Sequence, residues 1–453
     1  MLPQSSRITC GAMLAVAVFL VGQGRPADAG VKTWDGSTDV SWFTTAAWDP
    51  AGVPLATDNV VINSGRPISS SLDKINVSGG GSITLSGSTA QLGKKQSPSS
   101  WQAPQLYVGK TGSGQVLVTG GADLVTMATE LGCTSGAIGE VTLQGTGTTW
   151  SVGVTHFYVG ANGGQGILTV RDNASIDYFS EIDIGWAGTG AVTIDHATIN
   201  AASFMLSNGG SGTLTIRNSG LANVASTYVG YYVNTTGTVT VDGAASVLTN
   251  SGSSQGYLSV GRYGSGTVNV TNGGLIHNTA DLIVSDNFGH GTVSIVGPAS
   301  RIVNDGSLKV GALLTSGGSG EVRLASGGRV ESTNGIVLSE TSDISFTADS
   351  LGAGWLSAGG TATLDGILRF DFAPGYFPPA NTVFDIITAG RVTGEFDQFL
   401  SSQPVQLIYG SNTVSIKVVP EPGTVALIST GLVGLLVTRL RRGGGQRHQL
   451  SQH

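Results

Sequence analysis

The sequence predicts an all-β protein built as a right-handed parallel β-helix of about ten coils, with a cap at each end. The first observation is a phrase that recurs between Leu106 and Ser339. Its fullest copy reads Leu258-Ser259-Val260-Gly261, then Gly264-Ser265-Gly266 and Thr267-Val268-Asn269-Val270. The second is a step of about 26 residues between copies, which is typical of stacked repeats. The third is composition, because 70 glycines and many β-branched residues disfavour helices.

Each copy contains a run in which apolar and polar residues alternate. This period of two is typical of a strand with one buried face, so we expect Val268 to point inward and Asn269 outward. A small residue closes the first tetrapeptide of each copy, where a tight corner requires unusual backbone angles. These corner positions are Gly109, Gly132, Gly160, Gly185, Ser207, Gly230, Gly261, Ser285, Gly311 and Ser339.

A unit with two or three short strands cannot enclose a core alone, so successive units must stack. The array of residues 106–340 should therefore contain one stacked internal row just before the corners. The members of this row are Val108, Val159, Ile184, Val229, Val260, Val284 and Val310. The alternative is an antiparallel β-sandwich, which also has short strands at regular spacing. A sandwich gives no reason for the same glycine phrase to recur in the same order.

Residues 1–29 are predicted to be a secretory signal peptide. Arg7 precedes an apolar run over residues 8–21, and Ala27 and Ala29 are the small residues that a signal peptidase reads. A first transmembrane helix is the alternative, but the run is short of the roughly 20 residues needed to span a bilayer.

Residues 30–105 are expected to form an N-terminal cap and the first irregular coils. Trp34, Trp42 and Trp48 lie close together in this segment. They fit either a carbohydrate-stacking platform or a hydrophobic lid, and we favour the lid because an open solenoid end exposes unpaired strands. The Pro-containing stretch 94–100 is expected to be a loop on the solenoid wall.

The chain beyond the repeats divides into three parts. The phenylalanine-rich residues 341–418 are expected to form a C-terminal β cap. Residues 419–442 contain Pro420, Glu421 and Pro422, an apolar run over 425–437, and the basic residues Arg439, Arg441 and Arg442; residues 443–453 are a polar tail. The apolar run is short for a permanent span, and the arginines fit the positive-inside bias. A permanent anchor is the alternative.

Two resemblances add to this interpretation. Tyr158-Val159-Gly160 followed by Gly164-Gln165-Gly166 resembles the repeat of autotransporter passenger domains and of bacterial proteins with a PEP-CTERM tail. The tryptophan segment resembles the entry to such repeats, although Ala47 stands where the family usually has Asn. Residues 419–442 resemble the PEP-CTERM sorting signal itself. That resemblance implies transient anchoring in the inner membrane and cleavage near Pro420-Glu421-Pro422 by an exosortase, with the arginines setting the orientation.

Charge and motif spacing exclude several functions. Residues 30–419 contain 16 Lys and Arg against 27 Asp and Glu, a net charge of −11, which disfavours binding to nucleic acid. No catalytic, cofactor-binding or metal-binding residues are predicted, because the histidines are scattered with no HExxH pattern and no nearby carboxylate pair. Arg171, Asp172, Asp195 and Arg217 could gather on adjacent coils, and repeat periodicity alone would also align them.

The expected function is that of an exported, non-enzymatic structural or adhesive protein of the cell surface or extracellular matrix. Its expected partners are signal peptidase, an exosortase and extracellular polysaccharide. A glycan-active β-helix enzyme, either a lyase or a hydrolase, is the alternative. An acidic and basic cluster in a groove along one face would favour the enzyme.

Overall fold

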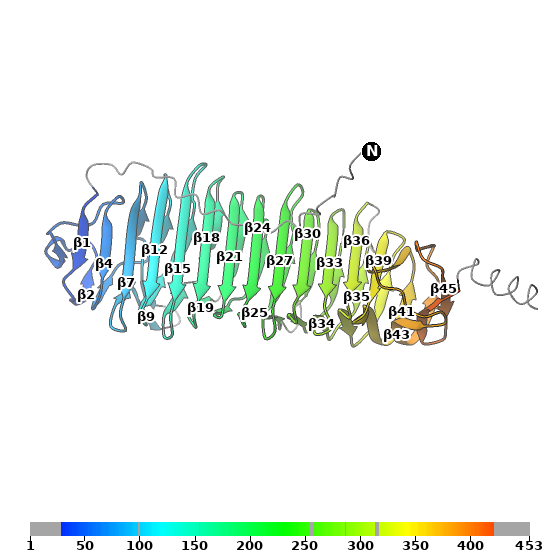
Figure 1. Cartoon of the computed structure of the whole chain (residues 1–453). Helices are drawn as coiled ribbons and strands as arrows, with labels where there is room; N and C mark the ends of the chain where they lie inside the picture. Colours follow the sequence, from blue (N-terminus) through cyan, green and yellow to red (C-terminus); the bar gives the residue numbers. More distant parts are fainter. Residues whose placement is uncertain are drawn as a thin grey trace, which may run out of the picture.

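The computed structural model describes residues 29–97, 100–153, 155–178, 180–252, 257–285, 287–312 and 317–420. These residues form a rod in which the strands of each coil lie beside those of the next (Figure 1). Each regular coil has three strands, so the rod has three parallel walls. The predicted parallel β-helix is confirmed.

The first wall faces the viewer in Figure 1 and has the longest strands, mostly of seven residues. Its register is kept residue for residue from coil to coil, as in Val239↔Val268↔Val293. Its strands are β4 (Asn59–Ile62), β7 (Gly81–Ser86), β12 (Ser113–Thr119), β15 (Ile138–Gln144), β18 (Gln165–Arg171), β21 (Thr189–Asp195), β24 (Ser211–Arg217), β27 (Thr236–Asp242), β30 (Ser265–Thr271), β33 (His290–Val296), β36 (Ser319–Ala325), β39 (Ser342–Asp349) and β42 (Ile367–Phe372).

The second wall has short strands because the chain soon turns another corner. They are β8 (Gln91–Leu92), β13 (Asp123–Thr126), β16 (Thr149–Val152), β19 (Ser175–Tyr178), β22 (Thr198–Asn200), β25 (Leu221–Val224), β28 (Val247–Asn250), β31 (Leu275–Asn278), β34 (Arg301–Asn304), β37 (Arg329–Ser332) and the first part of β41 (Trp355–Leu364).

The third wall closes each coil. It consists of β6 (Lys74–Val77), β11 (Gln105–Val108), β14 (Ala128–Leu131), β17 (Phe157–Ala161), β20 (Glu181–Trp186), β23 (Ser203–Leu206), β26 (Ser226–Val229), β29 (Leu258–Val260), β32 (Leu282–Val284), β35 (Leu308–Val310), β38 (Ile336–Leu338) and the end of β41.

The solenoid has about 13 turns, so the predicted number of about ten is too low. The additional coils lie outside the glycine-rich phrase. β7 precedes it and β42 follows it, yet both pair in parallel with the first-wall strands beside them. β7 keeps the alternating buried pattern, and its Gly81 is in register with Gly114 of β12. It lies in the segment 30–105, where irregular first coils were expected. At a strand spacing of about 4.8 Å, 13 coils give a rod roughly 60 Å long.

The core is a set of stacked rows of side chains inside the three walls. The expected row from Val108 to Val310 exists, since each member pairs in register with the next coil and is at most 1% exposed. Leu131, Leu206 and Leu338 complete it. Val268 is fully buried and its neighbour Asn269 is half-buried, so the predicted inward and outward sides are correct.

The corner after the third wall requires a left-handed backbone. Gly132 has φ of +64°, and a Cβ there would lie 2.1 Å from the carbonyl oxygen of Gln165. Ser207 and Ser285 occupy the same corner with positive φ and are fully buried. The Ser285 hydroxyl donates to the carbonyl of Gly289 at 2.9 Å. The predicted corner positions from 109 to 311 therefore have a left-handed backbone, and two of them accommodate a serine. Ser339, the last predicted corner, does not have positive φ.

The N-terminal end is closed by β1 (Val31–Trp34), β2 (Thr38–Ser41), the 3-10 turn η1 (Thr45–Ala47), β3 (Trp48–Asp49) and β5 (Arg66–Ile68). Trp34 and Trp42 each contact Trp48 edge-to-face at 4.8 Å. The three side chains are 2–4% exposed, which leaves no ring face for a sugar. The structure therefore supports the hydrophobic lid.

The stretch expected to be a loop at 94–100 contains strands instead. β9 (Lys94–Ser97) and β10 (Ser100–Gln102) pair antiparallel as a hairpin outside the solenoid. Trp101 of this hairpin packs on Val125 of the second wall. The expectation of a loop was wrong because burial of Trp101 on the wall stabilises the hairpin.

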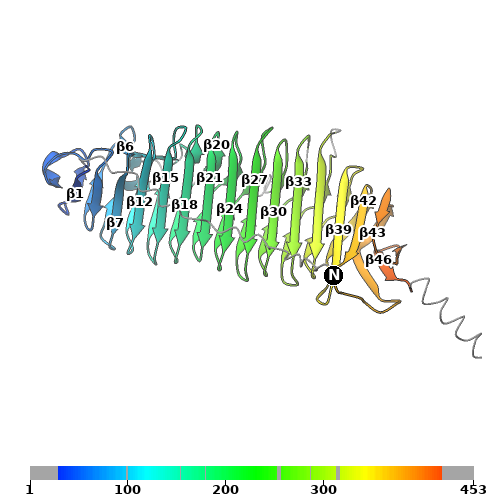
Figure 2. The ribbon, with the colours of Figure 1, turned by 45° about the horizontal axis from the view of Figure 1, so that its top comes forward.

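The C-terminal end closes with strands that depart from the coil pattern (Figure 2). β43 (Val383–Gly394) pairs antiparallel with β46 (Thr413–Val418), which also pairs with β45 (Val405–Tyr409); β40 (Gly352–Ala353) and β44 (Gln398–Leu400) lie beside the last first-wall strands. The amide of Val418 donates to Thr382 O and that of Val419 to Pro404 O, both at 2.9 Å. The chain is therefore fixed to this end as far as Val419.

Candidate functional site

The third wall carries an outward-facing row in which ring and carboxyl side chains alternate. Tyr107, Glu130, Tyr158 and Asp183 occupy the same register position on β11, β14, β17 and β20. His156 lies just before β17, two residues from Tyr158. We call these five residues the third-wall cluster.

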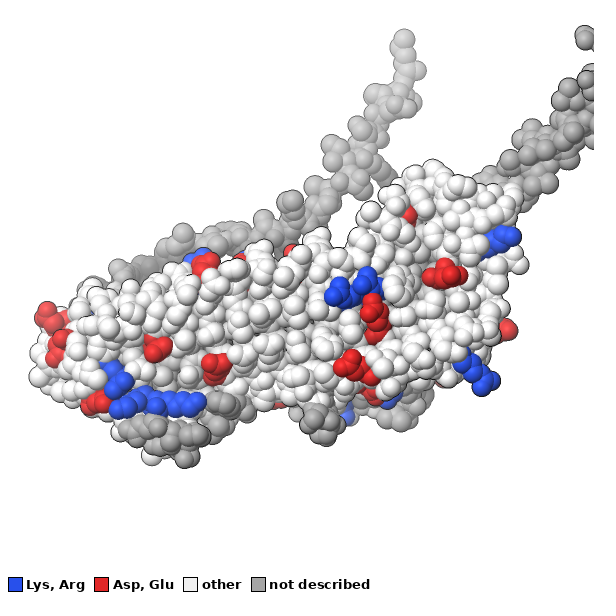
Figure 3. Space-filling model, turned by 90° about the horizontal axis from the view of Figure 1, so that it is seen from below, with Lys and Arg blue, Asp and Glu red and all other residues white. Residues whose placement is uncertain are grey.

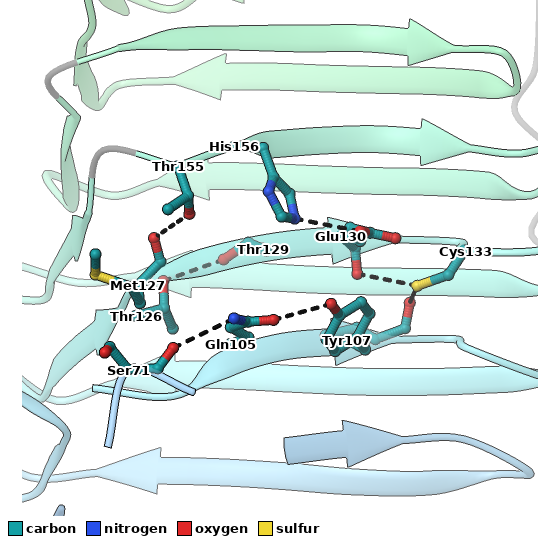
Figure 4. A network of polar contacts seen from close by, with 11 residues as sticks. Ser71, Gln105, Tyr107, Thr126, Met127, Thr129, Glu130, Cys133, Thr155 and His156 are labelled. Atoms are coloured by element: carbon teal, nitrogen blue, oxygen red, sulfur yellow. Dashed lines mark hydrogen bonds and ion pairs between the residues drawn. The ribbon is translucent and has the colours of Figure 1, made fainter. Parts of the chain in front are cut away.

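The centre of the cluster is a contact between adjacent coils. Nε2 of His156 lies 3.2 Å from Oε1 of Glu130, as Figure 4 shows. The His156 ring stacks on Tyr158 with ring centres 4.8 Å apart, and Tyr158 stacks on Trp186 at 4.6 Å with an interplanar angle of 5°. The two faces of Tyr158 are thus covered by protein rings. A sugar cannot stack on Tyr158 unless one of these rings moves.

Asp183 is the most perturbed carboxyl of the cluster. It is 6% exposed, and burial raises its pKa to about 6, although Asn208 Nδ2 donates to its Oδ1 at 2.8 Å and opposes the rise. Burial also raises the pKa of Glu181, two residues earlier on β20, while a hydrogen bond from Ser203 partly offsets this. A carboxyl that titrates near neutral pH can act as a general acid or base.

The tyrosines and Cys133 of this wall are poor nucleophiles. Burial is the main cause of the raised pKa values of Tyr107 and Tyr158, and nearby carboxylates add to it. Burial raises the pKa of the Cys133 thiol to about 12. Its Sγ lies 3.4 Å from the carbonyl oxygen of Glu130. The thiolate form that would react is therefore disfavoured.

Sequence reasoning missed the third-wall cluster. Glu130 and His156 are far apart in sequence, so a search for local motifs finds nothing. Their separation equals one coil step of about 26 residues, and this signal could have paired them. Among the described residues, no group of three or more His, Cys, Asp and Glu side chains is arranged to hold a metal ion.

The charged residues singled out in the sequence form a ladder at the end of the first wall. Arg171, Asp195 and Arg217 are register partners on β18, β21 and β24. Arg217 Nε lies 2.9 Å from Asp195 Oδ2. Asp172 lies in the turn beside the ladder with φ of +57°. Arg171 instead contacts the side chains of Gln144 and Asp172, and Arg217 is half-exposed. Repeat periodicity alone would produce this alignment.

Most of the predicted processing residues lie outside the described residues. Ala29 and Pro420 are at the ends of the described chain, whereas Ala27, Glu421, Pro422, Arg439, Arg441 and Arg442 lie beyond it. The apolar run 425–437 also lies beyond it. In the part of the chain that the structure describes, no helix is long and apolar enough to cross a membrane.

Comparison with known proteins supports the assignment of the tail. Residues 418–442 match the PEP-CTERM protein-sorting motif. Over 341 residues, 72% of its length, the chain is 26% identical to the "Uncharacterized lipoprotein YdeK" of Escherichia coli (strain K12). The aligned region spans only 24% of that relative's length. The motif identifies the chain as an exported protein of the cell surface or extracellular space that carries an exosortase sorting signal.

Proposed function

We propose that this protein is a non-enzymatic structural or adhesive rod that associates with extracellular polysaccharide after sorting. The observation that supports this most is the combination of the sorting motif at 418–442 with a solenoid whose surface carries little charge. Charged side chains are few and scattered on the face seen in Figure 3. Outward positions of first-wall strands such as β27 and β30 carry mainly hydroxyl and amide groups, which can exchange hydrogen bonds with sugar hydroxyls.

The testing experiment uses protein released by the producing cells. We expect it to co-sediment with extracellular polysaccharide from the same cells, and to leave the polymer chain length unchanged. Size-exclusion chromatography of the polysaccharide after long incubation with the protein measures the polymer chain length. Failure to co-sediment at any salt concentration would contradict the adhesive role.

A second candidate is a glycan-active enzyme, and the buried carboxyl of Asp183 with a pKa of about 6 is what favours it. Glu181 and Tyr158 supply further ionisable groups on the same wall. If the polysaccharide is shortened, the Asp183→Asn variant should lose that activity and keep its binding. Loss of both together would instead indicate that the substitution damages the wall.

A further inference from the structure

A polar hollow lies on the second wall beside the β9–β10 hairpin. It has a volume of about 380 Å³ and is open to solvent, and this volume is within the range of small-molecule sites. Its lining comes from the hairpin and from three successive second-wall strands and their corners. The lining residues are Lys95, Ser151, Asp177, Tyr178, Asn200, Ala201 and Ala202.

The sequence of the wall changes where the hairpin ends. Val125, Ser151, Asp177, Asn200 and Asn223 occupy one outward register position on successive coils. The first of them is apolar and is covered by the hairpin tryptophan. The next four are polar and lie beyond it. The outward side chain at this register position changes from apolar to polar at the hairpin edge. This is expected where the hollow opens to solvent.

Tyr178 belongs to the solenoid core behind this lining. It is 4% exposed, and its ring packs edge-to-face on the buried Phe157 with ring centres 6.0 Å apart. Side chains alternate along β19, so Asp177 faces outward while Tyr178 faces inward. The side chains that a ligand in the hollow would meet on this wall are therefore those of Ser151, Asp177 and Asn200.

An amide ladder extends from the hollow along the rod. Asn200 Nδ2 donates to Asp177 Oδ1 at 2.8 Å, and Asn223 Nδ2 donates to Asn200 Oδ1 at 2.9 Å. Each amide nitrogen has a second N–H for another acceptor. The rungs repeat at about 4.8 Å, close to the length of one pyranose unit in an extended chain.

We propose that this hollow binds one neutral hexose unit of a polysaccharide, and that Asn200 and Asn223 contact the units that follow along the rod. This inference rests on the proposed association with polysaccharide. The ammonium of Lys95, which lies over the Trp101 ring, and the carboxylate of Asp177 give the lining no net charge. The Ser151 hydroxyl and the Asn200 amide can exchange hydrogen bonds with sugar hydroxyls. A uronic acid would place a second carboxylate beside Asp177, which is unfavourable.

The experiment measures binding of neutral gluco-, manno- and galacto-configured tetrasaccharides, and of a uronic acid tetrasaccharide, to the full chain purified in detergent. Asn200→Ala removes the outward amide of the hollow and should weaken binding of a neutral tetrasaccharide about fivefold, the loss expected for one hydrogen bond. Asn223→Ala, the next rung of the ladder, should also weaken binding. Asn269→Ala, an outward asparagine of the first wall, should not.

The possible outcomes distinguish failure of the proposed site from failure of the proposed association with polysaccharide. If Asn200→Ala and Asn223→Ala both leave binding of the neutral tetrasaccharides unchanged, the site is overturned while the protein still binds polysaccharide. Preference for the uronic acid would overturn the neutral assignment. If no tetrasaccharide binds although the protein co-sediments with its own polysaccharide, the hollow is not the contact. If the protein also fails to co-sediment with its own polysaccharide, the proposed function is contradicted.

Discussion

Asn278 donates a hydrogen bond from Nδ2 to Oδ1 of Asn304 on the next coil, at 2.7 Å, although both side chains are fully buried. The same Nδ2 lies within hydrogen-bonding distance of the carbonyl oxygens of Ala280 and Asp281. Asn278 thus satisfies backbone groups at the corner between the second and third walls. The corner is held by polar contacts inside an otherwise apolar core.

Asn278→Ala should destabilise the protein by about 1–3 kcal/mol, because it leaves buried carbonyl groups without a donor. Urea denaturation monitored by circular dichroism measures this. Asn223→Ala removes an exposed amide of the second-wall ladder and should cost less than about 1 kcal/mol. Equal losses in the two variants would show that burial of the Asn278 amide has no special role.

Gly132→Ala should be more destabilising than Gly136→Ala, although both glycines have positive φ. A Cβ at Gly132 would lie 2.1 Å from the Gln165 carbonyl oxygen, whereas one at Gly136 would meet nothing within 4 Å. The second variant should lose only about 1–2 kcal/mol from the left-handed backbone. Thermal melts of both proteins test this, and similar melting temperatures would contradict the steric explanation.

Val268→Asp should cost several kcal/mol, because an unpaired carboxylate would lie between Val239 and Val293 of the adjacent coils. Asn269→Asp, on the outward side of β30, should be nearly neutral. Melting temperatures measured at neutral pH compare the two. A large loss in both variants would mean that the outward row is also under packing constraint.

Asp183 should make the protein more stable at pH 4 than at pH 7. Its folded-state pKa is raised from 3.8 to about 6, so the folded protein keeps a proton that the unfolded chain releases between these values. The contribution is fully present below about pH 4 and is lost as the pH rises through 6. A shift of this size corresponds to roughly 2–3 kcal/mol.

The pH dependence should be weaker in Asp183→Asn, because the amide does not titrate. Glu181 faces the same region and its raised pKa acts in the same direction, so some dependence should remain. Urea denaturation at intervals from pH 4 to 7 gives both curves. Parallel curves for the variant and the natural protein would show that Asp183 is not buried as described.

The sorting segment should be removed from the surface form of the protein. Replacing Arg439, Arg441 and Arg442 by Glu should disturb the membrane orientation and leave unprocessed precursor. Mass spectrometry of protein recovered from the cell surface should find no peptides from residues 425–439. Their presence in the natural surface form would indicate a plain anchor.

Replacing Pro420 and Pro422 by Ala should affect cleavage alone. The apolar run and the arginines are unchanged, so insertion should proceed and the protein should remain bound to the membrane. Cell fractionation followed by immunoblotting distinguishes a membrane-bound precursor from a released product. Normal release of this variant would show that the two prolines are not needed for processing.

The fold could be predicted because the same short pattern occurs many times. A single strand such as Val268–Val270 says little about the fold. A series of such strands, each preceded by the same small corner residue, is compatible with few architectures. The coil of β7 lies in the segment where irregular first coils were expected. The coil of β42 was missed because its strand follows the last corner phrase and was assigned to the cap. The hairpin was missed because its partners, Val125 and Met127, look like ordinary wall residues until Trp101 is placed on them.

The candidate site could not be predicted in the same way. Glu130, His156 and Asp183 come from three coils and come together only once the coil register is fixed. The register of a solenoid depends on corner lengths, which vary from coil to coil in this chain. The raised pKa of Asp183 also depends on burial, which an outward position in a strand does not suggest.

Val418 and Val419 are the first two residues of the sorting segment, and both are hydrogen-bonded to the rod. If the tail is held in the membrane, only residues 420–424 separate this end of the rod from the apolar run, so the surface around Thr382 and Pro404 would lie near the lipid headgroups. A processing enzyme would then have to fit between this surface and the bilayer, or act after β46 detaches. The stability of β46 should then set an upper limit on how fast the protein is released.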